Sequence, residues 1–277
     1  RGAGLFLSDF HTHPVFGDGN NTCREMIEAA AARGLAAYGI SEHSHMDYCG
    51  DGWVMIPAGE REYKKEMRAL QSEFSDRIEL FVGVEQDITS GSPTDEYDYV
   101  IGSAHVITVG GKMLHSAVDS SKERASAVIN ECFGGDALSY AEKYFETAAA
   151  VAKVTKCDIV GHFDLVNKYN EADHLFSTAD PRYQKAATDA MDELLKTCRV
   201  FEVNTGAMFR LGRTERYPQN WLLRYLKERG ADVILSSDAH QADAICYKFA
   251  ETEELLRQIG FKRRLTLTQN GFKTIDL

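Results

Sequence analysis

Short apolar runs alternate with longer amphipathic stretches along almost the whole chain of 277 residues. The apolar runs have the length of buried strands, and the amphipathic stretches have the spacing of helices that cover a sheet. The predicted strands are Leu5–Phe10, Ala36–Ser41, Ile78–Glu85, Tyr99–Ala104, Asp158–Gly161, Val200–Asn204, Asp232–Ser236 and Arg264–Leu267. The predicted helices are Cys23–Arg33, Glu60–Phe74, Ala137–Thr155, Arg182–Thr197, Trp221–Arg229 and Ala242–Ile259. Strands that are separated by helices pair in parallel, so the pattern predicts an α/β protein.

The chain contains no linker-like stretch of Pro, Gly or Ser, so we expect a single domain. Its number of β–α units favours a barrel. A doubly wound open sheet is the alternative, but such a sheet usually carries a glycine-rich phosphate loop after its first strand. Here the first strand is followed by His11-Thr12-His13, which disfavours that alternative.

Charge and composition exclude several classes of protein. The formal net charge of −11 argues against a general nucleic-acid surface, and no apolar run approaches the ~18 residues of a membrane span. The segment Arg1–Leu7 lacks the features of a secretory signal. The cysteines form no C-x-x-C pair: Cys23, Cys49, Cys132, Cys157, Cys198 and Cys246. Scattered thiols of this kind are typical of reduced proteins, so we expect a cytoplasmic protein.

Histidine and acidic residues gather where the predicted strands end. Seven of the nine histidines lie at a strand end or just beyond it: His11, His13, His43, His45, His105, His162 and His240. Acidic residues occupy matching positions: Asp18, Glu42, Glu85, Asp164 and Asp238. Because the carboxyl ends of all strands in a β–α barrel open on one mouth, where active sites form, we expect these side chains to converge.

Converging imidazole and carboxylate groups are the ligand set of Zn, Mn or Fe ions. One tetrahedral zinc ion takes about four ligands, so this larger set predicts two or three divalent ions with bridging carboxylates. Other residues have simpler expected roles. We expect an outer or surface position for His45, a salt bridge for Glu42, and solvent exposure for His115 and His174.

A series of short motifs carries these residues: Asp9-Phe10-His11-Thr12-His13, Asp18-Gly19, Ser41-Glu42-His43-Ser44, Gly83-Val84-Glu85-Gln86-Asp87, Ile101-Gly102-Ser103-Ala104-His105, Gly161-His162-Phe163-Asp164, Glu202-Val203-Asn204-Thr205-Gly206 and Ser237-Asp238-Ala239-His240. In content and order the series resembles the PHP (polymerase and histidinol phosphatase) family over nearly the whole chain. The chain length and Gly271-Phe272 resemble the histidinol-phosphate phosphatase branch of that family.

The resemblance implies a distorted TIM-like (β/α)7 barrel that forms one domain over residues 1–277, with a trinuclear metal site. Its implied ligands are His11, His13, Glu85 and Asp238 for one ion, Glu85, His105 and His162 for a second, and Asp18, His43 and His240 for a third. Some relatives have His where this chain has Asp18, which leaves the choice of metal open.

The implied reaction is hydrolysis of a phosphate monoester, with L-histidinol phosphate of histidine biosynthesis as the expected substrate. The ions lower the pKa of a water molecule, so that hydroxide attacks phosphorus, and they offset the charge of the transition state. Asp238 or His240 is expected to protonate the leaving alkoxide. The expected cationic partners of the phosphate are Lys168, Arg210 and Arg213.

The substrate pocket is less well defined by the sequence. Tyr48 and Trp53 are expected either to line it or to pack within their own loop. Some relatives place an arginine where this chain has Asn167 or Lys168, which leaves the leaving group open.

Two other functions stay open. An amidohydrolase-type barrel also begins with His-x-His, but it usually has a carboxylated lysine or a glutamate where this chain has His105. PHP domains attached to DNA polymerases serve as interaction modules, which the full ligand set and the acidic pI near 5.3 disfavour. The expected partner is a small phosphorylated metabolite, with no nucleic acid and no membrane. The sequence does not fix the oligomeric state, and a homodimer stays open because barrels commonly dimerise.

Overall fold

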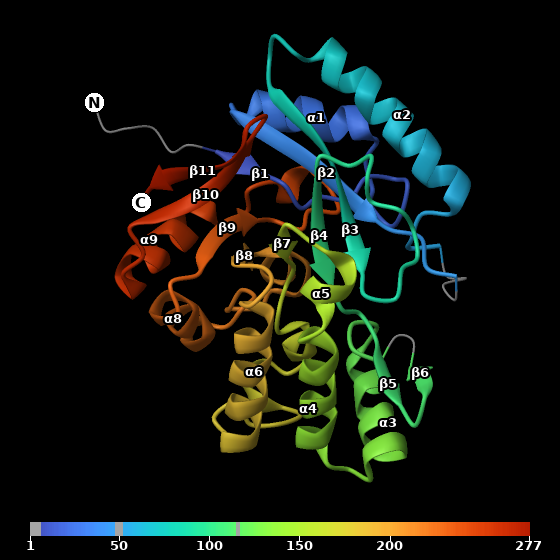
Figure 1. Cartoon of the computed structure of the whole chain (residues 1–277), viewed down its shortest axis with the longest axis vertical. Coiled ribbons are helices and arrows are strands. Elements are labelled where there is room, and N and C mark those ends of the chain that lie inside the picture. The colour runs from blue at the N-terminus through green and yellow to red at the C-terminus, as the bar shows by residue number, and fades with distance from the viewer. Residues whose placement is uncertain (1–6, 48–51, 115–116) are drawn as a thin grey trace.

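The predicted strands form one curled sheet (Figure 1). The computed structural model describes residues 7–47, 52–114 and 117–277, and within these residues the sheet has nine strands in the order β1-β2-β3-β4-β7-β8-β9-β10-β11. The first seven strands in this order are parallel: β1 (Ser8–Asp9), β2 (Ala37–His43), β3 (Glu79–Asp87), β4 (Tyr99–Ser103), β7 (Ile159–Val160), β8 (Val200–Asn204) and β9 (Asp232–Ser236). β10 (Arg263–Thr268) continues in parallel beside β9, and β11 (Gly271–Asp276) returns antiparallel to it.

The sheet closes into a barrel at its carboxyl end. Just beyond β1 and β9, Thr12 and Ala239 form a parallel bridge, in which the His13 amide donates to the Ala239 carbonyl at 2.8 Å. At the other end β10 reaches β1, where the Thr266 hydroxyl donates to Ser8 Oγ at 3.0 Å. The seven parallel strands from β1 to β9 therefore enclose a distorted barrel, as the resemblance implied, and the bridge between Thr12 and Ala239 lies beside the predicted metal ligands.

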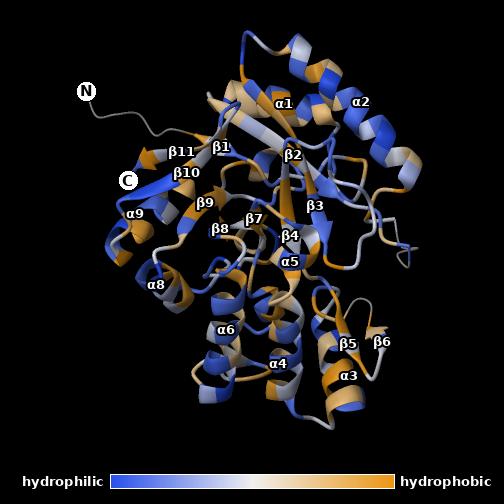
Figure 2. Ribbon diagram, viewed as in Figure 1, coloured by the Kyte–Doolittle hydropathy of each residue, from blue (hydrophilic) through white to orange (hydrophobic). Residues whose placement is uncertain are grey.

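Helices cover the outside of the barrel (Figure 1). They are α1 (Cys23–Ala32), α2 (Pro57–Glu73), α3 (Lys122–Phe133), α4 (Ala137–Ala148), α5 (Val151–Thr155), α6 (Pro181–Leu194), α8 (Asn220–Glu228) and α9 (Phe249–Ile259). The short helix α7 (Gly206–Leu211) lies at the mouth instead, where Arg210 contacts Asp238. Three short 3-10 turns lie at Leu165–Asn167, Glu171–Asp173 and Ala242–Ala244. Figure 2 shows that α2, α4 and α6 mix hydrophilic and hydrophobic residues, as expected of helices with one buried face. Of the helices in the described residues, none combines the length and apolar character that crossing a bilayer requires.

A small apolar cluster fills the barrel beneath the mouth, with Tyr99 and Phe10 among its members. The Tyr99 hydroxyl donates to the Phe10 carbonyl at 2.6 Å. Tyr99 also lies against two neighbouring strands, where a Cβ atom added at Gly39 or Gly83 would approach the tyrosine side chain to 2.3 or 2.2 Å. Only glycine fits such contacts without a shift of the backbone or the ring. Because Gly83 and Glu85 lie on the same face of β3, this packing sets the height of Glu85 at the mouth.

The structure corrects several of the predicted elements. The predicted helix Ala137–Thr155 is two helices, α4 and α5, and the predicted helix Ala242–Ile259 is a 3-10 turn followed by α9. Cys246 and Lys248 adopt positive φ angles of 58° and 54° between these last two elements, which interrupts the helix. The helices α3 and α7, the strand β11 and the hairpin of β5 (Ile107–Val109) and β6 (Lys112–Leu114) were not predicted.

Candidate metal centre

The parallel strands bring all nine predicted metal ligands to the carboxyl end of the barrel. His43 and Glu85 belong to β2 and β3, and the other seven lie in the segments after β1, β4, β7 and β9: His11, His13, Asp18, His105, His162, Asp238 and His240. These residues form four overlapping groups whose ligand atoms lie within 4.8 Å of one another: His13, Asp18, His43 and His240; His11, Glu85 and His162; His11, His13 and Asp238; His43, Glu85 and His105. Side chains that are distant in the sequence therefore share one site.

Glu85 lies at the centre of this site and is only 1% exposed. Its Oε1 atom is 2.7 Å from His162 Nε2 and 3.3 Å from His105 Nε2. Its Oε2 atom is 2.8 Å from His43 Nδ1 and 3.2 Å from His11 Nε2. The two oxygens therefore face different sets of imidazoles, as a carboxylate that bridges two ions does.

Asp18 lies at the outer edge of the site. Its Oδ1 atom is 3.1 Å from His240 Nε2 and 3.6 Å from His43 Nε2. The Asp18 side chain is 40% exposed, whereas His43 is buried. This group is thus the one nearest to solvent, and it has the mixed carboxylate and imidazole donors that divalent transition metals accept.

The spacing of the donor atoms suits coordination of a divalent ion better than it suits hydrogen bonds between the donor atoms. Ligand atoms about 2.1 Å from a tetrahedral ion lie roughly 3.4 Å apart, and His13 Nε2 is 3.3 Å from Asp238 Oδ1 and 3.4 Å from Glu85 Oε2. His11 Nε2, His13 Nε2 and Glu85 Oε2 are buried, and none of them has a well-formed hydrogen bond to a described residue. Buried polar atoms are rarely left in this state, so the cluster has the character of a ligand set.

Three further carboxylates hold the outer nitrogen atoms of the histidines. Glu202 Oε2 accepts from His11 Nδ1 at 2.7 Å, Glu42 Oε1 from His13 Nδ1 at 3.1 Å, and Asp87 Oδ2 from His105 Nδ1 at 3.0 Å. Such partners fix the ring and leave Nε2 free to bind an ion. Glu42 was predicted to form a salt bridge, and it does so here with His13.

Glu202 and Asp87 were not assigned a role from the sequence. The signal for both was available, since Glu202 lies near the end of a predicted strand and Asp87 lies two residues beyond Glu85, on the same face of β3. The alternation of side chains along a strand would have directed both of them inward.

Electrostatics in the cluster favour bound cations. Burial lowers the pKa of His13, but the facing carboxylates of Asp238 and Glu42 raise it to about 9. Burial raises the pKa of Glu85, yet the facing imidazoles of His43 and His11 hold it well below its usual range. Without an ion, protonated imidazoles must therefore balance the buried carboxylates, and a divalent ion would take the place of these protons.

The predicted phosphate-binding cations lie at different distances from this cluster. Arg210 Nη2 is 3.0 Å from Asp238 Oδ2, so Arg210 reaches the ligands themselves. Lys168 Nζ is 4.0 Å from Asp119 Oδ2, and burial lowers the pKa of this lysine. Arg213 is buried and donates to the carbonyls of Asn167 and Lys168, so it holds the backbone of the loop that carries Lys168.

The other candidates divide between the site and the surface. The Trp53 ring lies 4.9 Å from the ring of His43 and 5.4 Å from that of His105, so Trp53 lines the cluster. His45 bonds Met55 O and Asp47 at the edge, each at 3.0 Å, in the outer position predicted for it. His174 is exposed, as predicted. His115 and Tyr48 lie outside the described residues.

Asp164 is buried near the predicted ligand His162 but faces other groups. Its Oδ2 atom accepts from the Gln219 amide at 3.1 Å. Burial is the largest influence on this carboxyl, and its pKa rises to about 7. Asp164 therefore connects the loop after β7 to the segment between β8 and α8.

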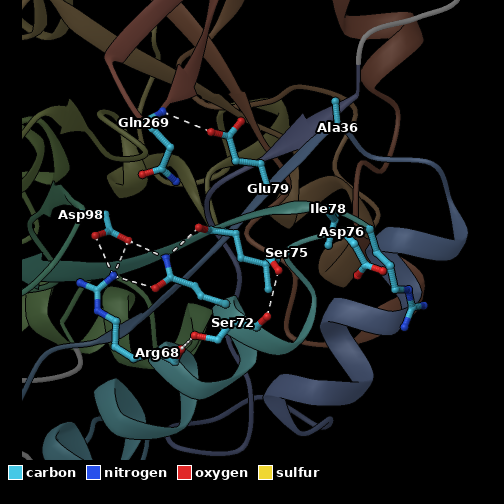
Figure 3. Close-up of a pocket in the computed structure, with 12 residues that line it drawn as sticks. Ala36, Arg68, Ser72, Ser75, Asp76, Ile78, Glu79, Asp98 and Gln269 are labelled. Atoms are coloured by element: carbon cyan, nitrogen blue, oxygen red, sulfur yellow. Dashed lines mark hydrogen bonds and ion pairs between the residues drawn. The ribbon is translucent and has the colours of Figure 1, made fainter.

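A pocket lies at the end of the barrel opposite the ligand cluster, beside the first residues of β2 and β3 (Figure 3). Two of its charged side chains satisfy each other, because Arg68 Nη1 donates to both oxygens of Asp98 at 2.8 Å. Gln71 donates to the Leu80 carbonyl at 2.8 Å and to Asp98 at 3.0 Å. This pocket contrasts with the metal-ligand cluster, where key donor atoms lack such partners.

Comparison with known proteins agrees with this geometry. The family model of the PHP domain matches residues 9–206. A protein of Deinococcus radiodurans described as "Probable histidinol-phosphatase" is 30% identical over 264 residues, which are 92% of this chain and 94% of that protein. The histidinol-phosphatase of Lactococcus lactis is 24% identical over 279 residues and 94% of each chain.

A solved structure has the same fold. The crystal structure of the Lactococcus lactis histidinol phosphate phosphatase, complexed with Zn, L-histidinol and phosphate, superposes with a TM-score of 0.72 at 20% identity. The superposition covers 96% of this chain and 98% of that one. With the motifs, the barrel and the ligand cluster, these matches establish that the chain belongs to the PHP family, in the branch of the histidinol-phosphatases.

Proposed function

We propose that this protein is a metal-dependent phosphatase that hydrolyses L-histidinol phosphate to histidinol and phosphate. The observation that carries the proposal is the convergence of five imidazoles on the two oxygens of Glu85, at 2.7 to 3.4 Å. The likeness to histidinol-phosphatases over most of the chain supports the choice of substrate. A relative of the same fold binds Zn, L-histidinol and phosphate.

The residues of the cluster would hold up to three divalent ions of Zn, Mn or Fe. The deep part of the cluster would hold two of them through His11, His13, Glu85, His105, His162 and Asp238. The outer part would hold a third through Asp18, His43 and His240. When bound, such ions lower the pKa of a water molecule and offset the negative charge on the phosphate oxygens.

Arg210 would orient the phosphate group. Its guanidinium already contacts Asp238 beside the ligand cluster, and arginine binds phosphate through two parallel hydrogen bonds. Lys168 would add a second positive charge from the loop after β7. Arg213, which donates to the carbonyl of Lys168, would contribute by holding that loop in place.

Asp238 and His240 would carry the proton to the leaving group. Burial opposes ionisation of Asp238, but Arg210 and His11 hold its pKa well below the usual range. Burial and Arg210 lower the pKa of His240 to about 4. Both groups therefore begin without a proton, and the one that keeps a donor atom unbound by the ions would accept the proton of the attacking water and pass it to the departing alkoxide oxygen.

The test uses the purified protein, stripped with a chelator and reloaded separately with Zn, Mn or Fe(II). Phosphate release is measured from L-histidinol phosphate, from a sugar phosphate and from a nucleoside monophosphate. We expect the highest kcat/KM for L-histidinol phosphate. A higher value for another ester would reassign the substrate within the class, and no release with any ion would overturn the phosphatase assignment.

Two controls accompany this assay. The Glu253→Gln variant removes a buried carboxylate that pairs with Arg264 outside the cluster, so it reports effects on the fold alone. Light scattering of the same samples measures whether the protein forms a homodimer, which the sequence leaves open.

A further inference from the structure

One buried carboxylate contacts ligands that come from two different strands. Glu202 belongs to β8 and is 1% exposed. Its Oε2 atom accepts from His11 Nδ1 at 2.7 Å, and its Oε1 atom accepts from the backbone amide of His162. His11 follows β1 and His162 follows β7, so Glu202 joins segments on either side of β8 (Figure 1).

Asn204 extends this connection to a third strand. Its Nδ2 donates to Glu202 Oε1 at 2.9 Å and to Asp238 Oδ2 at 3.3 Å, just after β9. Asn204 is itself held in place, because its Oδ1 accepts from the Gly206 amide at 2.8 Å. Its backbone also pairs with that of Tyr217, through bonds of 2.7 and 3.0 Å.

The hydrogen bond from His11 determines which nitrogen atom faces the cluster. A carboxylate can only accept, so it requires a proton on His11 Nδ1 and leaves the lone pair of Nε2 for an ion. His11 Nε2 is 3.2 Å from Glu85 Oε2 and 3.8 Å from Asp238 Oδ1. An amide at position 202 could instead donate to Nδ1, which would move the proton to Nε2 and remove that lone pair.

We propose that Glu202, supported by Asn204, is a positioning residue that fixes His11, His162 and Asp238 together for the deep ions of the cluster. The inference rests on the proposed metal site but not on the proposed substrate. It deepens the assignment of that site, because one residue acts on ligands of both deep positions.

The outer group depends on different partners. Glu42 accepts from the backbone amide of His43 at 2.9 Å. It also accepts at 3.1 Å from the ring of His13, a residue that belongs to both the deep and the outer groups. Among the described residues, the hydrogen bonds of Glu202 go to His11, His162 and Asn204, and none goes to a residue of the outer group. Loss of Glu202 should therefore lower the affinity for the deep ions and leave the affinity for the outer ion unchanged. A general destabilisation of the barrel would lower the affinity for every ion.

The experiment measures binding of Co²⁺ alone to the chelator-stripped full chain. Calorimetry gives the number of ions and their affinities, and the visible absorption of Co²⁺ reports the ligands. Four variants are compared with the original protein: Glu202→Gln, Asn204→Ser, Asp18→Asn and Glu253→Gln. Glu253→Gln is the matched control, since it removes another buried glutamate, one that pairs with Arg264 at 2.7 Å.

We expect Glu202→Gln to lower the affinity for the deep ions by about 10- to 100-fold, the range for loss of an outer partner of a metal-bound histidine. Asp18→Asn should abolish binding of the outer ion, and Glu202→Gln should bind that outer ion with unchanged affinity. The control variant Glu253→Gln should bind all the Co²⁺ ions as the original protein does. Unchanged affinities in Glu202→Gln, or equal weakening of every ion, would overturn the inference.

Asn204→Ser decides the matter if Glu202→Gln does not fold. A several-fold loss of affinity at the deep ions supports the inference, and unchanged binding overturns it. Failure of the proposed function would look different, because a protein that binds Co²⁺ in this pattern but releases no phosphate from L-histidinol phosphate would refute only the substrate.

Discussion

His162 Nε2 lies 2.7 Å from Glu85 Oε1, so an imidazole that follows β7 meets a carboxylate of β3 across the intervening strand β4. The contact spans 77 positions of the sequence. It requires that both strands end at the same height, which the parallel register of β3, β4 and β7 provides. The curvature of the sheet, more than any single loop, thus assembles the candidate site.

Replacement of Glu85 tests the centre of the site. Glu85→Gln keeps the size of the side chain but removes the charge that faces the imidazoles. We expect metal affinity and phosphatase activity to fall by more than about 100-fold, the upper range for outer partners, because Glu85 would itself bind the ions. Circular dichroism should report an intact fold, and a variant with full activity would contradict the central role of Glu85.

Metal binding should release protons at neutral pH. The facing carboxylates of Asp238 and Glu42 raise the pKa of His13 to about 9 despite its burial, so we expect His13 to be protonated in the ion-free protein at pH 7.5. An ion must displace this proton, and affinity should therefore rise as the pH increases towards 9 and fall as it decreases. Calorimetry in buffers of different ionisation enthalpy measures the number of protons released. Zero release at pH 7.5 would contradict the expected protonation of the cluster.

Arg210 is predicted to recognise phosphate through a planar pair of donors. Arg210→Lys keeps the charge but loses the second hydrogen bond, so we expect kcat/KM to fall by roughly 10- to 100-fold. The control is Arg61→Ala, an exposed arginine of α2 that donates to the Pro57 carbonyl. Steady-state kinetics on the reloaded enzyme measures both. Equal kcat/KM values for Arg210→Lys and the original protein would remove Arg210 from the substrate site.

The sequence predicted the central strands well because their apolar runs are sharply bounded. The bounds of β8 and β9 are as predicted, and both strands are almost wholly buried. The strand β11 was missed because most of its residues are exposed, so its apolar pattern is weak. The break between α4 and α5 falls at Ala149 and Ala150, residues that favour helix and give no sign of an interruption.

The candidate site was predictable for a similar reason. A residue at the end of a parallel strand has a defined location, so the positions of His11 and Asp238 could be inferred without coordinates. The hydrogen bond between His11 and Glu202 could not, because it depends on how β1 and β8 curve towards each other. Arg213 shows the same limit, since its loop, although near the mouth, directs the guanidinium to the Asn167 carbonyl.

The close packing of Gly83 against Tyr99 connects stability with the site. A Cβ atom at Gly83 would lie 2.2 Å from the tyrosine ring, so Gly83→Ala must shift either the ring or β3. We expect a loss of about 1–3 kcal/mol in the free energy of unfolding, the usual cost of overpacking a core, together with weaker metal binding because Glu85 moves with the strand. Gly91→Ala is the matched control, since a Cβ atom there meets nothing within 4 Å. Denaturant titration and Co²⁺ binding of both variants measure the two effects. If Gly83→Ala matched Gly91→Ala in both measurements, the packing of Tyr99 against Gly83 would not be what sets the position of Glu85.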